Sequence, residues 1–203
     1  SDYSVIQVLK MVTEHHVEQV AVFRSNTMPY GKFAEACIGV SEYYNSALMM
    51  VENNDIGAQV CNLIWEEFEY TYIVNTDKKG LGTRSTKKSK LVANMTLKSY
   101  MDVGWLTIRD NDTLKELSQY EEVTPNVYKG PRSGHDDLVC GLLWGMYFVT
   151  TPYFEAKDLS VKNIDKQFIL KRKLESDSAP VVIFNSELRT VDGYGLDWGG
   201  MDK

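Results

Sequence analysis

The sequence predicts an α/β protein in which a mixed central sheet carries helices on its faces. Two apolar stretches with strand-like alternation come first, and segments with helical spacing then alternate with short, apolar, strand-like runs. The chain has 203 residues, of which 43% are hydrophobic and 25% charged, values that are ordinary for a globular protein. We expect a core over residues 1–150 and a less regular C-terminal extension over residues 151–203.

The first part of the chain is predicted to be a hairpin followed by a helix and a buried strand. Tyr3–Met11 and Val17–Phe23 are rich in Val, Ile and Leu, and the short polar link between them favours an antiparallel pair. Tyr30–Tyr44 carries apolar residues at helical spacing, and Ala47–Val51 is a continuous apolar run typical of a buried strand. Ile56–Phe68 is then predicted to be an amphipathic helix.

The later part is predicted from apolar periodicity and turn residues. Tyr70–Val74 is expected to be a strand, and Ser89–Met101 a helix that ends near Gly104. The remaining expected elements are a helix over Asp110–Tyr120 capped by Asn111 or Asp112, a loop over Glu121–Ser133 with a short strand at Val127, an apolar helix over Asp136–Thr150 and an edge strand over Ala179–Phe184.

The sequence carries no pattern of a membrane span or of a signal peptide. No apolar run is long enough to cross a bilayer, and the N-terminal residues lack the pattern of a signal peptide. Cys37, Cys61 and Cys140 have apolar neighbours, which indicates buried free thiols in a reducing compartment. The chain begins almost inside a strand-like run, so we expect it to be a piece of a longer protein.

The distribution of charge is more informative than its sum. A net charge of −6 argues weakly against nucleic-acid binding. However, Lys78–Lys90 contains six basic residues and no acidic one. A local basic patch on an acidic protein is compatible with a nuclease that has a carboxylate centre.

Acidic residues occupy two positions at which side chains from distant elements can meet. Glu52 ends the predicted buried strand, and Asp136 and Asp137 begin the predicted apolar helix. Carboxylates gathered at one edge of a sheet cannot all stay ionised without a cation, and oxygen ligands favour Mg²⁺ or Mn²⁺. A pair of such ions can stabilise the attacking and leaving oxygens of a phosphodiester.

Each of these signals also has an ordinary structural interpretation. An Asp at a helix start is more often a cap that interacts with the helix dipole, and a Glu after a strand is more often a solvated loop residue. His135 on its own is more often a loop histidine than a ligand, and a basic run is commonly a solvated loop. Function is therefore inferred from the ordered set of motifs, not from any single residue.

The ordered set resembles the nuclease domain of T-even-like phage large terminases. The motifs that carry the resemblance are Asp2-Tyr3, Ser25-Asn26-Thr27, Glu52 with Asn54 and Gly57, the Lys/Thr-rich segment Thr86–Lys90, Thr96-Leu97-Lys98, Gly134-His135-Asp136-Asp137-Leu138-Val139 and Ala179-Pro180-Val181. Their order and approximate spacing agree along nearly the whole chain.

This resemblance implies an RNase H-like nuclease with an Asp-Glu-Asp metal centre. Glu52 corresponds to the second acid and Asp137 to the third, with Asp136 as its neighbour. The first acid is expected on a core strand just upstream of Asp2, and Asp2 itself matches a supporting acidic position. Arg84, Lys87, Lys88 and Lys90 are expected to hold the DNA backbone, and His135 to orient a water or contact a phosphate.

The implied activity is cutting of concatemeric viral double-stranded DNA during genome packaging in the host cell cytoplasm. The implied partners are a terminase ATPase domain in the same full-length chain, the portal protein and the small terminase subunit. These residues contain no GxxxxGK[ST] loop, so the motor would precede them. Two alternatives are another RNase H-like nuclease, such as a junction resolvase, and a non-catalytic module that docks on the portal, to which residues 151–203 would contribute.

Overall fold

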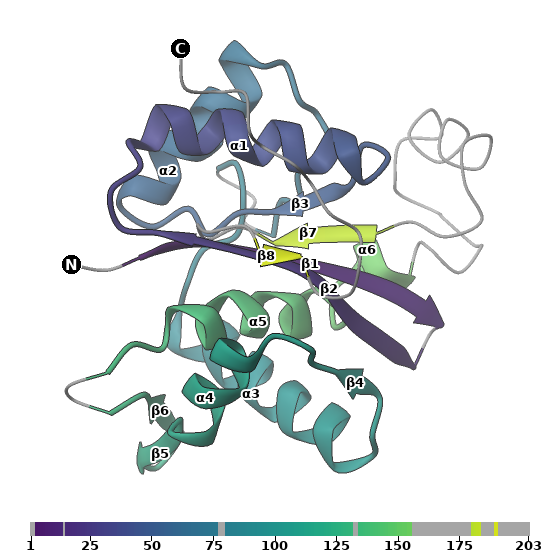
Figure 1. Cartoon of the computed structure of the whole chain (residues 1–203), viewed down its shortest axis with the longest axis vertical. Helices are drawn as coiled ribbons and strands as arrows, with labels where there is room; N and C mark the ends of the chain where they lie inside the picture. Colours follow the sequence, from purple (N-terminus) through teal and green to yellow (C-terminus); the bar gives the residue numbers. More distant parts are fainter. Residues whose placement is uncertain are drawn as a thin grey trace.

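The computed structural model describes residues 3–13, 15–76, 80–131, 134–155, 180–183 and 189–190. They form a mixed α/β fold in which one sheet lies between two layers of helices (Figure 1). Along the sheet the strand order is β3-β7-β1-β2-β4, and β8 also pairs with β2. The mixed α/β class predicted from the sequence is therefore confirmed.

The centre of the sheet is the predicted hairpin. β1 (Ser4–Thr13) and β2 (His16–Ser25) pair antiparallel, from Ser4 opposite Ser25 to Thr13 opposite His16. A register shift lies between Val8 and Leu9, because Val8 pairs with Ala21 whereas Leu9 pairs with Gln19. An extra residue of this kind bends a strand and increases its twist.

One layer of helices contains α1 (Tyr30–Tyr43), α2 (Ile56–Asn62) and the π-helical turn η1 (Leu63–Glu67). The segment predicted as one helix over Ile56–Phe68 is thus an α-helix that continues as a π-helix. The core beneath this layer contains Ile6, Val8, Ala21, Phe33, Ala34, Cys37, Val40, Met49, Val60 and Ile64.

The opposite layer contains α3 (Lys87–Asp102), α4 (Asn111–Ser118) and α5 (Asp137–Phe148) (Figure 1). Its core includes Leu9, Met11, Val17, Leu48, Met50, Ala93, Leu97, Val139, Leu142, Leu143, Met146 and Phe148. β3 (Leu48–Met50) contributes to both cores because successive strand residues face opposite sides of the sheet. The fully apolar run at 47–51 is explained by this burial on both faces.

Several short elements differ from the sequence-based expectations. Tyr70–Val74 is not a regular strand: Ile73 alone forms an isolated bridge, to Met49. The short strand expected at Val127 is confirmed as β6 (Val127–Lys129), but it pairs with β5 (Glu121–Thr124), which was not expected, to form a second sheet. β4 (Leu106–Thr107), which pairs parallel with β2, and α6 (Pro152–Glu155) were not expected.

The strand expected at Ala179–Phe184 is present, but its expected position at the edge of the sheet is wrong. β7 (Pro180–Ile183) lies inside the sheet, antiparallel to β1 and parallel to β3. β8 (Arg189–Thr190) pairs with β2 instead. Short apolar runs do not reveal a position within a sheet, because pairing between segments distant in the sequence is set by the tertiary fold.

Helix boundaries agree closely with the prediction, but one cap does not. The cap of α4 is Asp110, whose Oδ2 accepts a hydrogen bond from the Thr113 backbone N–H at 2.7 Å, rather than Asn111 or Asp112. Thr86 and Ser89 form a capping box at the start of α3. No helix within the described part of the chain is long and apolar enough to span a membrane.

Candidate functional site

Glu52 lies where β3 ends, on the face of the sheet that α5 covers. Leu48 and Met50 face the α5 layer, and Glu52 continues this alternation. Oε2 of Glu52 accepts a hydrogen bond of 3.1 Å from the indole Nε1 of Trp144 in α5. The carboxylate predicted as a metal ligand is therefore held against the helix that carries the other predicted acids.

Hydrogen bonds join the basic segment (Lys78–Lys90) to this end of β3. Glu52 forms an isolated parallel bridge with Thr83, and the Asn53 backbone N–H donates to the Thr83 carbonyl at 2.9 Å. The side chain of Asn53 donates to the Leu81 carbonyl at 2.6 Å, and Oδ1 of Asn54 accepts from the Ser85 N–H at 3.1 Å. Leu81, Thr83 and Ser85 of the basic segment therefore lie against the strand end that carries Glu52, whereas Lys78 and Lys79 lie outside the described residues.

Gly57 is the closest backbone neighbour of Glu52. A Cβ at position 57 would lie 1.9 Å from the Glu52 carbonyl oxygen, which no real side chain tolerates. The start of α2 can approach the end of β3 this closely only because residue 57 is glycine. Gly57 thus permits the close approach of α2 to the backbone of Glu52.

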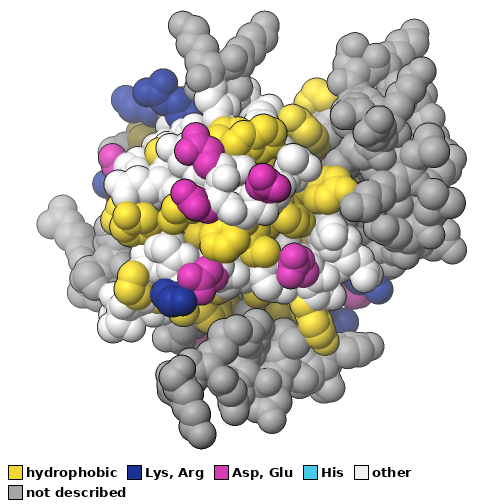
Figure 2. Space-filling model, turned by 90° about the horizontal axis from the view of Figure 1, so that it is seen from above, with side chains coloured by type: hydrophobic (Ala, Val, Ile, Leu, Met, Phe, Trp, Pro, Cys, Tyr) yellow, Lys and Arg dark blue, Asp and Glu magenta, His cyan; other side chains and the backbone are white. Residues whose placement is uncertain are grey.

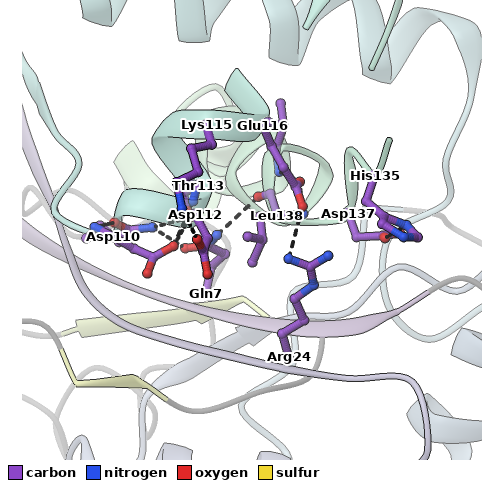
Figure 3. Close-up of polar contacts among 12 residues, drawn as sticks. Gln7, Arg24, Asp110, Asp112, Thr113, Lys115, Glu116, His135, Asp137 and Leu138 are labelled. Atoms are coloured by element: carbon purple, nitrogen blue, oxygen red, sulfur yellow. Dashed lines mark hydrogen bonds and ion pairs between the residues drawn. The ribbon is translucent and has the colours of Figure 1, made fainter. Parts of the chain in front are cut away.

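The two aspartates at the start of α5 have different surroundings. Asp136 lies just before the helix, and its Oδ2 accepts a hydrogen bond from the Gly130 N–H at 2.9 Å, which closes the base of the β5–β6 hairpin. Oδ2 of Asp137 lies 3.4 Å from Nδ1 of His135, and Figure 3 shows these two side chains side by side. His135 in turn contacts the Tyr3 ring edge-on, with centroids 4.7 Å apart.

A buried carboxylate that the sequence analysis missed caps α5. Oε2 of Glu116 in α4 accepts hydrogen bonds from the backbone N–H groups of Leu138 at 2.8 Å and Val139 at 3.4 Å. Its Oε1 lies 3.3 Å from the Arg24 guanidinium, which also covers the Tyr3 ring at 4.0 Å (Figure 3). Burial raises the pKa of Glu116, while the hydrogen bonds and Arg24 act in the opposite direction.

A second buried polar network joins the start of α5 to the central sheet. Gln7 donates to the Leu138 carbonyl at 3.1 Å and accepts from Gln19 at 2.8 Å. Oε1 of Gln19 accepts from the backbone N–H of Asp110 at 2.9 Å, and its Nε2 donates to Thr113 at 3.1 Å. The sequence signal for this network is the polar residues Gln7 and Gln19 at buried positions of β1 and β2. Their hydrogen bonds hold the start of α5 against β1.

Glu52, Asp136 and Asp137 act electrostatically on the partly buried thiol of Cys140. Burial, together with the negative charges of Asp136, Glu52 and Asp137, raises the pKa of Cys140 to about 12, while Lys90 acts in the opposite direction. Cys140 is three positions after Asp137 in α5 and four before Trp144, so all three occupy one side of the helix. The two predicted metal ligands therefore flank the same stretch of α5.

The described residues do not by themselves complete a metal centre. Among them, no group of three or more His, Cys, Asp or Glu side chains is arranged to hold an ion. Asp2 lies outside the described residues. Glu52 and Asp137 each carry carboxylate oxygens of the kind that Mg²⁺ and Mn²⁺ accept.

The predicted DNA-binding cations are all exposed. Arg84 precedes α3, and Lys87, Lys88 and Lys90 lie in its first turn, which contains no acidic residue. Cations at a helix N-terminus oppose the helix dipole, so they do not stabilise α3. In contrast, the face covered by α1 carries acidic side chains among apolar ones (Figure 2), including Glu35 and Glu42 of α1.

Comparison of the sequence with models of known protein families gives no match.

Proposed function

We propose that this chain is an RNase H-like, metal-dependent endonuclease of the large-terminase type, which cuts concatemeric viral double-stranded DNA during packaging. The observation that carries the proposal is the arrangement around α5. The Glu52 carboxylate accepts a hydrogen bond from this helix, and Asp137 is the first residue of the helix. Hydrogen bonds also join the exposed basic segment to the strand end that carries Glu52. The mixed sheet between two helical layers is compatible with this fold.

In this proposal, Glu52 and Asp137 hold Mg²⁺ or Mn²⁺ together with an acid on the strand expected before Asp2. The bound ion supplies an activated water and neutralises charge on the phosphate. The chain itself positions the duplex: Arg84, Lys87, Lys88 and Lys90 bind backbone phosphates, and none of these contacts reads bases. Cutting is accordingly expected to be largely independent of sequence.

The deciding experiment is Asp137→Asn in a protein that also carries the expected upstream strand. An amide keeps the size of the side chain but lacks the charge that holds a divalent cation. Mn²⁺-dependent cleavage of plasmid DNA should therefore be lost while the thermal unfolding temperature changes little. Asp112→Asn is a suitable control, because Asp112 forms an exposed ion pair with Lys115 at 2.9 Å, on α4.

The competing interpretation is a non-catalytic module that docks on the portal protein. The same experiment separates the two functions. Full metal-dependent cleavage by Asp137→Asn would remove this aspartate from the metal centre, and absence of cleavage by the unmodified longer protein would favour docking.

A further inference from the structure

The strongest unassigned contact at the candidate site is the hydrogen bond between Trp144 and Glu52. The indole Nε1 donates to Oε2 at 3.1 Å, and among the described residues this is the hydrogen bond that the Glu52 side chain makes. The indole is 4% exposed and meets the Tyr147 ring edge-on, with centroids 5.9 Å apart. Trp144 therefore reaches Glu52 from a packed position with little freedom to rotate.

The chemical nature of the donor matters. An indole N–H is neutral and donates a single hydrogen bond, so it orients a carboxylate without neutralising it. Lys or Arg in this place would compete with a metal ion for the negative charge. Within the described part of the chain, Glu52 forms no ion pair with a basic side chain, although Lys90 is near enough to influence Cys140.

The two oxygens of the Glu52 carboxylate have different surroundings. Oε2 is engaged by the indole, and Oε1 has no hydrogen-bond partner among the described residues. A carboxylate with one oxygen held by a rigid neutral donor can offer the other to a cation at low entropic cost. Outer hydrogen bonds of this kind orient metal ligands, and their loss typically costs 10–100-fold in metal affinity or activity.

We propose that Trp144 is a positioning residue for Glu52, which orients this carboxylate for binding of a divalent cation. The inference rests on the proposed metal-dependent function, because it assigns Trp144 a role at the same site. A merely structural role would need no metal: a buried indole N–H generally finds an acceptor, and removing that bond would then affect stability alone.

The test compares Trp144→Phe with Trp65→Phe, since Trp65 lies exposed in η1. Mn²⁺ affinity is measured by electron paramagnetic resonance on a protein that includes the expected upstream strand, together with the thermal unfolding temperature. Trp144→Phe should weaken Mn²⁺ binding by about 10–100-fold. Cleavage at saturating Mn²⁺ should recover in part, because the defect lies in holding the ion. Trp65→Phe should leave the affinity unchanged.

A second measurement avoids any dependence on how well Trp144→Phe folds. In the unmodified protein, added Mn²⁺ should broaden the indole N–H resonance of Trp144 more than that of Trp65. The Trp144 resonance should also shift in the Glu52→Gln variant. A Trp144→Phe variant with native Mn²⁺ affinity would overturn the positioning role, whereas equal broadening of the two indole resonances would count against a metal site beside Glu52. Unchanged Mn²⁺ binding in Glu52→Gln would instead overturn the metal site itself.

Discussion

Replacing Gly57 with alanine tests the packing that places Glu52. A Cβ at this position would lie 1.9 Å from the Glu52 carbonyl oxygen, whereas real Cβ contacts are not shorter than 3.0 Å. The start of α2 and the end of β3 must therefore separate by at least 3.0 − 1.9 = 1.1 Å. Overpacking of this kind typically costs about 1–3 kcal/mol of unfolding free energy.

The same displacement would act on the proposed chemistry. A misplacement of about 1 Å at a catalytic group can reduce a rate by about 10²-fold. We therefore expect Gly57→Ala to lose stability in urea denaturation and to lose metal-dependent cleavage more than its stability alone explains. Gly31→Ala is the matched control, because a Cβ there meets nothing within 4 Å, and alanine in α1 should stabilise by up to about 1 kcal/mol. Equal stability of Gly57→Ala and the unmodified protein would refute the close packing.

Three further predictions concern the helix caps and the basic segment. Because burial raises the pKa of Glu116 above its ordinary 4.5, its stabilising contribution is complete below about pH 4.5 and is lost as pH rises through the folded-state pKa. The stability of the unmodified protein relative to Glu116→Gln should thus fall over that window in pH-dependent urea titrations, and a constant difference would contradict the assignment. Asp110→Ala should cost about 1–2 kcal/mol because it removes a helix cap, whereas Asp112→Ala should cost less than 1 kcal/mol. Lys87→Glu with Lys88→Glu should weaken DNA binding and reduce the slope of log affinity against log salt by up to about 2, since each phosphate contact contributes about 0.9; an unchanged slope would exclude these lysines from the interface.

Local patterns predicted those parts of the fold that depend on neighbouring residues. Alternation along β1 and β2, helical spacing in α1 and the apolar run of α5 each determine their own element. β7 could not be placed in this way, because its position between β3 and β1 depends on partners far away in the sequence. A short strand at Val127, in β6, was predicted, whereas β5 is fully exposed and therefore lacks the apolar pattern by which strands are recognised.

The motif residues separate into those at the site and those that support the fold. Ser25 of the Ser-Asn-Thr triplet accepts hydrogen bonds from the N–H groups of Thr27 and Met28 at 3.1 Å, which shapes the turn into α1. Gly57 permits close packing on Glu52, and Leu97 lies on the buried side of α3. Sequence order alone does not distinguish such structural roles from ligand roles, since either role requires a particular residue at a particular position.

Asp136 and Asp137 illustrate that distinction and allow it to be tested. Asp136 is engaged by the Gly130 N–H, so Asp136→Ala should cost about 1.5–3 kcal/mol, the typical contribution of a hydrogen bond to a charged group, and should loosen the hairpin. Mn²⁺ affinity should change little in this variant.

Asp137 should show the reverse pattern. Asp137→Asn loses the favourable interaction of a charge with the helix dipole, about 0.3–1 kcal/mol, and weakens the contact with His135, and it also removes the charge proposed to hold the cation. Hydrogen exchange of the β5–β6 amides and Mn²⁺ titration, measured on both variants, separate the two effects. If Asp136→Ala abolished Mn²⁺ binding while Asp137→Asn retained it, Asp136 would be the ligand and its bond to Gly130 would have to break when the ion binds.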